Sequence, residues 1–390
     1  MPYEFYKIFW NILKDDLHEI LTYAIENLTI TESQSLGVIT LQPKNGDKTL
    51  LSNWRPITLM TCDYKILTKV FAARLKHIIP KIICQEQFCC PGKSIIDSNL
   101  IMRDVLYFCN ENNIQGAVLT LDWSKAYDRV DHNFLFAVLA KLGFCDSFIK
   151  ILKLFCSNVR SVIQINGNIT SSFHIGRGVR QGCPLSMMIY VLFKEALYSR
   201  IKALDSIKGP ELPNNNSLKI LGYADDTNLL LRDNESIIEA MKVIKMFETA
   251  AGAILNENKT KIFGVGSWNN KVDWPIPWIQ SSITSFKSLG ILYSNDFNTA
   301  VYINWEAVLS AIETKIQTMQ TIRSTIYQRA ILLNCLIFAK LWYVSHIFLL
   351  PVSYANKIKR VAFNYIWGRK YYEPIKRSTL YSPKNEGGLV

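Results

Sequence analysis

Two adjacent aspartates inside an apolar stretch constrain the fold of this chain more than any other feature of its sequence. Asp225 and Asp226 stand between residues 218–223 and 227–231, two apolar runs with the composition of β-strands. The pattern therefore predicts a hairpin that carries both carboxylates at its tip. Two unpaired acids at one turn repel each other, and a bound divalent cation that prefers oxygen ligands, Mg²⁺ or Mn²⁺, would relieve the repulsion. An isolated Asp-Asp pair is more often only a polar turn.

A third acid, Asp122, is placed in the same way, because it ends the compact apolar run 117–121. If this run is a strand beside the hairpin, Asp122 and Asp225 project from the same edge of one sheet. Carboxylates that bridge two metal ions about 4 Å apart suit in-line nucleotidyl transfer, in which one ion activates a 3′-hydroxyl and the other neutralises the leaving pyrophosphate. We therefore favour a catalytic metal site over a polar turn.

Apolar periodicity along the rest of the chain predicts an α+β fold, with a small antiparallel sheet flanked by helical lobes. Helices are expected within the first forty residues and in the segment that follows 54–59 and stops at Pro80. Further helices are expected over 134–142, 147–156 and 235–251, from Pro184 to about 204, and over most of 305–367. Strands are expected over 37–42, 54–59 and 117–121, and in two hairpins, one turning at Asn166-Gly167 and the other at the paired aspartates. Residues 268–278, rich in Trp and Pro, are typical of a linker.

The composition narrows the class of protein. Of the 390 residues 49% are hydrophobic, which excludes intrinsic disorder as the main state. The nine cysteines are odd in number and form no C-x-x-C motif, so they do not indicate a disulfide framework, a zinc ribbon or a thioredoxin-type site. The formal net charge of +12 indicates a polyanionic partner, either a nucleic acid or a membrane surface.

Residues 331–350 have the length of a membrane span, but Lys340 interrupts them, and a charge at mid-membrane costs roughly 3 kcal/mol. We therefore expect a buried helix of a terminal lobe and no membrane partner. The first twenty residues carry several charges and do not form a signal peptide, so we expect an intracellular protein, in the nucleus, the cytoplasm or both.

Several short motifs occur in the order found in the reverse transcriptases of non-LTR (LINE-type) retrotransposons, and the chain resembles that family over essentially its whole length. The palm motifs are resembled by LDWSKAYDRV at 121–130, RGVRQGCPLS at 177–186 and YADD at 223–226. The fingers motifs are resembled by LQPK at 41–44, NWRPI at 53–57, DYKI at 63–66 and PGKS at 91–94. Later segments of the family are matched by ILNENK at 254–259, SLGI at 288–291, YIWGR at 365–369 and PKNEGGL at 383–389.

The resemblance implies a right-hand polymerase, with fingers and N-terminal helices over 1–115, a palm with the catalytic motifs over 116–267, and a thumb and C-terminal connector over 268–390. The implied activity is that of an RNA-directed DNA polymerase, which extends a DNA 3′-end on an RNA template by two-metal nucleotidyl transfer in retrotransposition. The implied partners are template RNA, a DNA primer or target and dNTPs, and the implied cofactor is Mg²⁺ or Mn²⁺. The sequence predicts no particular oligomeric state.

The resemblance also implies which residues are catalytic. Asp122 and Asp225 would hold the metal ions, with Asp226 as a secondary ligand or an electrostatic support. Lys259 would protonate the leaving pyrophosphate, a step that a well-placed ammonium group can perform. A plain surface lysine is the alternative for Lys259.

Five other residues would bind the substrates. Arg55 and Lys44 would contact the incoming triphosphate, as cationic side chains do. The ring of Tyr127 would block a ribose 2′-hydroxyl and so select deoxynucleotides, although the position also suits a core aromatic residue. Gln181 and the backbone of Gly182 would lie beside the template base and the nucleotide, because glycine permits a close approach.

The chain departs from the family in its extent. It starts inside a motif that ordinarily follows an upstream segment, no endonuclease domain precedes it, and no Cys/His knuckle follows it. We therefore expect a fragment that lacks the endonuclease. The alternative function is a non-catalytic nucleic-acid-binding remnant of a decayed retrotransposon, and turnover would separate the two. An RNA-templated RNA polymerase also uses adjacent aspartates on a hairpin, but Tyr127 speaks against it.

Overall fold

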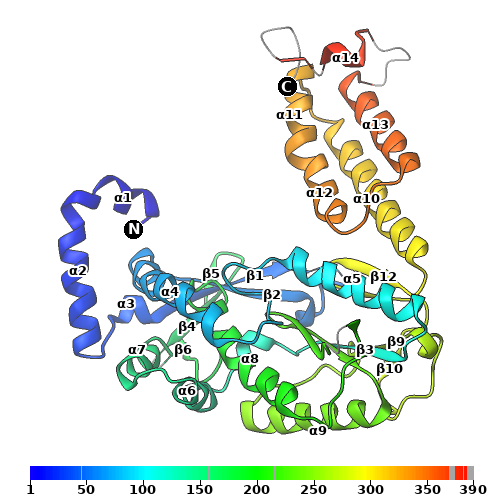
Figure 1. Cartoon of the computed structure of the whole chain (residues 1–390). Helices are drawn as coiled ribbons and strands as arrows, with labels where there is room; N and C mark the ends of the chain where they lie inside the picture. Colours follow the sequence, from blue (N-terminus) through cyan, green and yellow to red (C-terminus); the bar gives the residue numbers. More distant parts are fainter. Residues whose placement is uncertain (45, 157–158, 214–216, 369–373, 381, 384–390) are drawn as a thin grey trace.

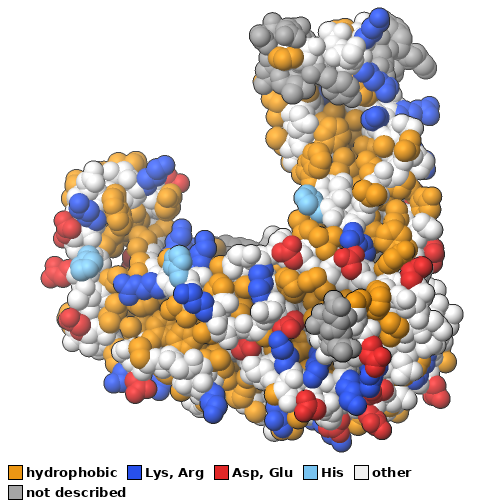
Figure 2. All heavy atoms as spheres, viewed as in Figure 1, with side chains coloured by type: hydrophobic (Ala, Val, Ile, Leu, Met, Phe, Trp, Pro, Cys, Tyr) orange, Lys and Arg blue, Asp and Glu red, His pale blue; other side chains and the backbone are white. Residues whose placement is uncertain are grey.

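The computed structural model describes residues 1–390 apart from 45, 157–158, 214–216, 369–373, 381 and 384–390. The body of the molecule contains two five-stranded sheets and a two-stranded hairpin, with helices packed around them (Figure 1). A helical arm at the N-terminus and a helical lobe at the C-terminus rise from the same side of this body, and Figure 2 shows the hollow between them. The predicted α+β organisation is confirmed. The motif expected at 383–389 lies outside the described residues except for Pro383.

The larger core surrounds a sheet that we call the palm sheet. Its strands stand in the order β10 (Gln280–Ser281), β9 (Lys261–Val265), β3 (Gly116–Leu121), β8 (Asp226–Leu231) and β7 (Ile220–Tyr223). The central strand β3 pairs antiparallel with β8 and with β9. β3 is largely apolar because both faces of the sheet are covered: Ala117 and Leu119 pack into one core, and Val118 packs into another.

Helices cover both faces of the palm sheet. The first core includes residues of α4 (Cys62–Ile82), α6 (His132–Lys141), α7 (Asp146–Cys156), α8 (Ser186–Ala203) and α9 (Asn234–Ala251). The second core includes residues of α5 (Ile95–Glu111), of the hairpin β11 (Ser285–Ser288) and β12 (Ile291–Ser294), and of the C-terminal lobe. Short 3₁₀ turns lie at η1 (Leu51–Asn53), η2 (Ala126–Arg129) and η4 (Gly266–Trp268).

The second large sheet contains the predicted finger strands. Its order is β2 (Trp54–Leu59), β1 (Leu36–Pro43), β4 (Arg160–Ile165) and β5 (Asn168–Ile169), and β6 (Phe173–His174) also pairs with β4. The predicted hairpin at Asn166-Gly167 is confirmed, since both residues have the positive φ angles that a two-residue turn requires. Because β1 pairs with β4, strands from the range predicted for the fingers and from the range predicted for the palm share one sheet.

The N-terminal arm and the C-terminal lobe are both helical (Figure 1). The arm contains α1 (Tyr3–Ile8), α2 (Trp10–Glu26) and α3 (Glu32–Ser35). The lobe contains α10 (Phe297–Met319), α11 (Ile326–Leu332), the π-helical segment η5 (Leu333–Phe338), α12 (Ala339–Ser345), α13 (Val352–Ile366) and α14 (Arg377–Leu380).

The prediction of one buried helix over 331–350 is wrong. The segment is divided among α11, η5 and α12, with Leu333 and Ile337 buried and Trp342 exposed. A lobe built of few helices can bury only one face of each, so the apolar residues on the other face remain in contact with solvent. Within the described ranges no helix is both long enough and apolar enough to cross a membrane.

Helix α4 also differs from its prediction, because it continues through Pro80 to Ile82. Proline lacks an N–H group, so the last turn of the helix forgoes one hydrogen bond at this position. Leu75 and Ile79 are almost fully buried, and their packing holds the end of α4 against the core.

Candidate active site

The hairpin with the paired aspartates has the shortest connection that two antiparallel strands allow. Tyr223 of β7 pairs with Asp226 of β8, so that only Ala224 and Asp225 form the turn. Asp226 is therefore the first residue of a strand and not part of the tip. Ala224 has a φ of 54°, a backbone region that a two-residue turn demands and that alanine rarely adopts. Such a conformation persists only when its surroundings hold it in place.

The third acid lies at the same end of the sheet. Leu121, the last residue of β3, pairs with Thr227 of β8. Asp122 directly follows this last residue, so it lies level with Asp226 on the neighbouring strand. The prediction that the two acidic strands are neighbours is confirmed, and Asp122 and the hairpin turn lie at one edge of the palm sheet.

The three carboxyls influence one another. Burial, followed by the negative charges of Asp225 and Asp122, raises the pKa of Asp226 to about 6. Partial burial and the two neighbouring charges together keep a proton on Asp226 at pH values well above the usual pKa range of an aspartate.

Lys259 reaches this cluster because the segment after α9 docks beside Asp122. The N–H of Asn256 donates to the carbonyl of Asp122 at 2.7 Å, and the N–H of Ser124 donates to the carbonyl of Ile254 at 2.8 Å. This docking places Lys259 Nζ 3.9 Å from Asp122 Oδ2.

The aspartates do not form a closed ligand set. The part of the chain that the structure describes contains no group of three or more His, Cys, Asp and Glu side chains able to hold a metal ion by themselves. Asp122, Asp225 and Asp226 nevertheless fit a divalent cation, because they are oxygen ligands whose mutual repulsion a cation would remove. Mg²⁺ is commonly held by one or two carboxylates together with substrate phosphates, so an open ligand set suits a nucleotide substrate.

Tyr127, the residue predicted to select deoxynucleotides, lies in η2 beside the acidic hairpin. Its ring stacks on that of Tyr190, with 4.6 Å between centroids and 20° between planes. Burial raises the pKa of Tyr127, and the charge of Asp225 raises it further, which shows that the half-buried ring lies near the hairpin turn. The stack fixes the position of the ring.

Gln181 and Gly182 are held against the finger strand β2. The N–H of Thr58 donates to the carbonyl of Gln181 at 2.8 Å. Gly182 has a φ of 114°, and a Cβ atom there would lie 2.6 Å from the carbonyl oxygen of Thr58, so no other residue fits without a backbone shift. A cavity of about 300 Å³ lies beside this contact and is lined by Gln181, Thr58 and Asp128 among others.

Lys44 and Arg55 lie together at the end of the sheet where the chain leaves β1 and enters β2. Gln42 pairs with Arg55, and the N–H of Lys44 donates to the carbonyl of Asn53 at 2.7 Å. Burial raises the pKa of Asp128, and neighbouring cations including Lys44 oppose the rise. Among the described residues neither cation forms an ion pair or hydrogen bond with the three aspartates, so the structure groups these two residues with the fingers and not with the acidic cluster.

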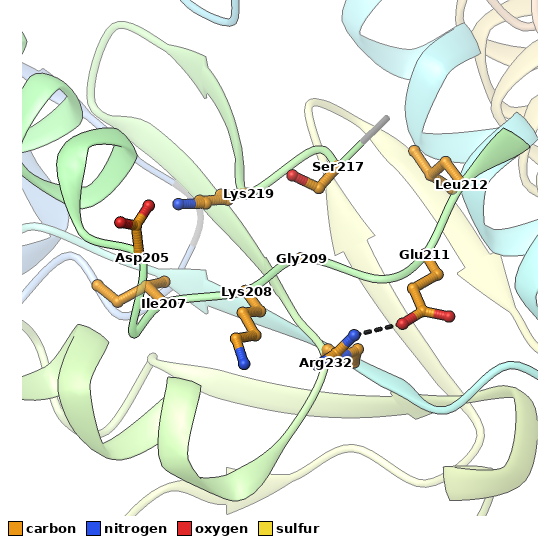
Figure 3. Close-up of a pocket in the computed structure, with 9 residues that line it drawn as sticks. All are labelled: Asp205, Ile207, Lys208, Gly209, Glu211, Leu212, Ser217, Lys219 and Arg232. Carbon is orange, nitrogen blue, oxygen red and sulfur yellow. Dashed lines mark hydrogen bonds and ion pairs between the residues drawn. The ribbon is translucent and has the colours of Figure 1, made fainter. Parts of the chain in front are cut away.

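A separate cavity of about 500 Å³ lies at the other end of the hairpin (Figure 3). Lys219, just before β7, and Arg232, just after β8, line it together with Lys208 and Glu211. Arg232 forms an ion pair with Glu211, and Lys219 donates to the carbonyl of Leu204 at 2.9 Å. This cavity contains none of the predicted site residues.

Two residues near the site were missed by the sequence analysis, Gln87 and Lys194. Both are fully buried, although they are polar. Lys194 Nζ lies 3.9 Å from the ring centroid of Trp123, the residue after Asp122. Helical spacing could have revealed Lys194, because it stands four residues from the buried tyrosines 190 and 198 on α8. Gln87 gives no local signal.

Comparisons with known proteins agree with these features. Residues 42–292 match the family described as "Reverse transcriptase (RNA-dependent DNA polymerase)". The chain is 31% identical over 399 residues to the "Transposon TX1 uncharacterized 149 kDa protein" of Xenopus laevis, which covers 99% of this chain and 29% of that protein. It is 27% identical over 230 residues to the "Retrovirus-related Pol polyprotein from type-1 retrotransposable element R2" of Popillia japonica, covering 58% of this chain and 32% of that protein. The chain thus spans about a third or less of the length of these relatives.

Solved structures resemble this one in fold. The telomerase of Candida albicans in complex with a TWJ fragment of telomeric RNA has a TM-score of 0.50 at 11% identity, over 93% of this chain and 67% of that chain. The apo telomerase of Candida tropicalis has a TM-score of 0.50 at 14% identity, over 92% of this chain and 62% of that chain. These likenesses confirm the predicted architecture of a right-hand polymerase.

Proposed function

Since the chain belongs to the reverse transcriptase (RNA-dependent DNA polymerase) family, we propose that it extends a DNA 3′-end on an RNA template during retrotransposition. The observation that supports this most directly is the meeting of Asp122 with the hairpin acids Asp225 and Asp226 at one sheet edge. Nucleotidyl transfer needs carboxylates in this arrangement.

Members of this family use divalent metal ions, and we propose Mg²⁺, with Mn²⁺ as a substitute, held by Asp122, Asp225 and Asp226. When bound, the metal would activate the 3′-hydroxyl and neutralise charge on the pyrophosphate. Without a metal ion, Asp226 holds a proton near neutral pH more readily than an ordinary aspartate does, because its pKa is raised. Loading of the site is thus coupled to the loss of this proton.

The chain's other residues bind and orient the reactants. Lys259, whose Nζ lies 3.9 Å from Asp122 Oδ2, would give a proton to the leaving pyrophosphate. The stacked ring of Tyr127 would exclude a 2′-hydroxyl, and Lys44 and Arg55 would contact the triphosphate from the finger strands. The backbone at Gln181 would lie against the templating base.

The proposed partners are template RNA, a DNA primer and dNTPs, and the net charge of +12 favours such polyanions. The proposed division is fingers over 1–115, palm over 116–267 and thumb over 268–390. The hollow between the N-terminal arm and the C-terminal lobe (Figure 2) would hold the primer–template duplex.

Primer extension tests the proposal. The purified chain is mixed with an RNA template, a DNA primer, dNTPs and Mg²⁺, and Asp225→Ala is compared with wild type. We expect Asp225→Ala to abolish incorporation while RNA binding stays largely intact, and Glu313→Ala, which removes an exposed acid from α10, to behave as wild type. If wild type incorporates no more than Asp225→Ala, the enzyme proposal fails and a nucleic-acid-binding remnant is favoured.

A further inference from the structure

Gln87 is a buried polar residue in the loop between α4 and α5. Its side chain is fully buried. A buried amide is stable only when it finds hydrogen-bond partners, so its partners indicate what it is for. Its Oε1 accepts a hydrogen bond from the N–H of Cys89 at 3.0 Å and a longer one, 3.4 Å, from the N–H of Ala224.

Ala224 is the strained residue of the acidic hairpin, and it directly precedes Asp225. A turn of only two residues has few contacts of its own. The bond from Ala224 to Gln87 is therefore an external restraint on the residue whose conformation sets the direction of Asp225.

The backbone on either side of Gln87 fixes the hairpin as well. The N–H of Gly222 donates to the carbonyl of Glu86 at 2.9 Å, and the N–H of Phe88 donates to the carbonyl of Gly222 at 2.8 Å. The segment 86–88 thus pairs along the outer edge of β7, the last strand of the palm sheet. On the other side, a Cβ atom on Gly222 would lie 2.3 Å from the hydroxyl oxygen of Tyr198. The hairpin is held between the loop and α8.

Lys93 closes the loop that carries Gln87. Its Nζ donates to the carbonyls of Cys84 at 3.3 Å and of Gln87 at 3.1 Å, and also to that of Gln85. One ammonium group therefore joins three carbonyls of the same loop, which keeps the Gln87 side chain aimed at the hairpin.

The amide of Gln87 also has an unused donor. Its Nε2 is buried and has no hydrogen-bond partner in the described part of the chain. An unpaired buried donor destabilises a fold, so the site is not optimised for stability. An apolar side chain of the same length would avoid this cost but would remove the amide oxygen from Ala224, whose N–H would keep only the weaker interaction with the Cys89 sulfur.

We propose that Gln87 is a positioning residue for nucleotidyl transfer, whose amide oxygen holds the Ala224 turn and thereby aims the Asp225 carboxylate. The inference rests on the proposed function only in that Asp225 is taken as a metal ligand. Gln87, which is fully buried, would act through Ala224 and not by direct contact with substrate or metal.

Two substitutions separate the acceptor from the bulk of the side chain. Gln87→Met keeps the length and removes the acceptor, whereas Gln87→Glu keeps an acceptor oxygen. We expect Gln87→Met to lower kcat for dNTP incorporation at least tenfold, to raise the Mg²⁺ concentration at half-maximal rate several-fold, and to leave the KM for dNTP within twofold. Gln87→Glu should recover most of the rate. Gln85→Met, in the same loop but exposed, is the matched control.

A second measurement does not depend on turnover. Mn²⁺ binding, followed by the loss of the free-ion EPR signal, should weaken at least fivefold in Gln87→Met and stay unchanged in Gln85→Met. Lys93→Met, which loosens the loop without touching the hairpin, should shift Mn²⁺ binding in the same direction by a smaller factor. If wild type lacks incorporation, the proposed function fails but the Mn²⁺ series still decides the role of Gln87.

Two results would overturn the inference. One is Mn²⁺ binding and Mg²⁺ dependence in Gln87→Met equal to those of wild type. The other is a loss that Gln87→Glu does not recover and that follows the unfolded fraction, as measured by thermal unfolding.

Discussion

Lys259 Nζ lies 3.9 Å from Asp122 Oδ2, although Lys259 comes after α9 and Asp122 directly follows β3. The side chains are 69% and 40% exposed, so water screens the pair. An exposed ion pair contributes about 1 kcal/mol or less. A metal ion that binds Asp122 therefore displaces Lys259 at low cost, and the freed ammonium group remains beside the site where pyrophosphate would leave.

Removing this ammonium group should separate metal binding from catalysis. We expect Lys259→Met to bind Mn²⁺ at most about fivefold more tightly, the equivalent of about 1 kcal/mol. We expect single-turnover incorporation to fall about 100-fold or more, because a general acid is lost. The control is Lys261→Met, an exposed lysine in β9. Equal losses of incorporation in Lys259→Met and Lys261→Met would show that Lys259 is only a surface lysine.

The raised pKa of Asp226 predicts how stability depends on pH. Its carboxyl has a pKa of about 6 in the folded chain, against about 3.9 when unfolded. Folding thus favours the protonated form of Asp226. The stability that this proton gives the folded chain is complete below pH of about 4 and is lost as the pH rises through about 6. In EDTA, Asp226→Asn should raise the free energy of unfolding at pH 7.5 by about 1 kcal/mol, a value reduced for solvent screening.

Urea unfolding at two pH values checks the effect of Asp226→Asn. At pH 3 the variant and wild type should be equally stable, because Asp226 is then largely protonated in both the folded and the unfolded chain. Asp15→Asn, on the exposed face of α2, should change neither curve. A gain of the same size at both pH values would mean that charge repulsion is not its source.

Much of the fold could be predicted because the determining patterns are local. The strands β3, β7 and β8 come from largely apolar runs that lie next to Asp122, Asp225 and Asp226, so both the strands and their shared edge follow from the sequence. Asn166-Gly167 between two apolar runs is a strong local signal for a two-residue turn. The predicted stop at Pro80 is wrong because a local rule ends a helix there, whereas the packing of Ile79 holds α4 in helical form as far as Ile82.

The support of the site could not be predicted, because it depends on contacts between distant segments. Gln87 looks like any loop glutamine until residues 86–88 pair with β7. The positive φ of Ala224 follows from the length of the turn and not from the residue type. The burial of Lys194 depends on the helices and strands that close over α8.

Tyr127 should act through its ring and not through its hydroxyl. The ring stacks on Tyr190, so Tyr127→Phe keeps the barrier in place and should keep the preference for deoxynucleotides. Tyr127→Ala opens that space and should raise kcat/KM for ribonucleotides relative to deoxynucleotides at least tenfold. Steady-state incorporation of matched dNTP and rNTP pairs measures this ratio. An unchanged ratio in Tyr127→Ala would make the ring a core aromatic only.

Lys194 should destabilise the folded chain relative to an apolar residue at the same position. Burial lowers its pKa well below the usual range, while the charge of Asp225 partly offsets the shift. The contact of Lys194 Nζ with the Trp123 ring stabilises the fold by about 2 kcal/mol at most. Burying an unpaired ammonium group destabilises it by several kcal/mol, which is the larger effect. Lys194→Met should therefore raise the free energy of unfolding at pH 7 by more than about 1 kcal/mol.

The pH dependence of wild type provides a second check on Lys194. Because its pKa is lower in the folded chain than in the unfolded one, the unfolded chain binds more protons, and this residue makes stability rise with pH up to about 10. In Lys194→Met that contribution disappears. Lys315→Met, on the exposed face of α10, should leave stability unchanged at every pH. Destabilisation by Lys194→Met would show that the ammonium group has a partner that supports the fold.

Gly182 should allow the loop of the predicted palm to pack against the finger strand β2, because it has no side chain to separate them. Gly182→Ala places a Cβ atom 2.6 Å from the Thr58 carbonyl at a φ of 114°, so the loop must leave β2. We expect about 2 kcal/mol of destabilisation in urea unfolding and a raised KM for dNTP. Gly176→Ala lies in the same loop with nothing within 4 Å of its Cβ and should be neutral. Equal effects of the two substitutions would show that the contact between Gly182 and Thr58 does not hold the two parts together.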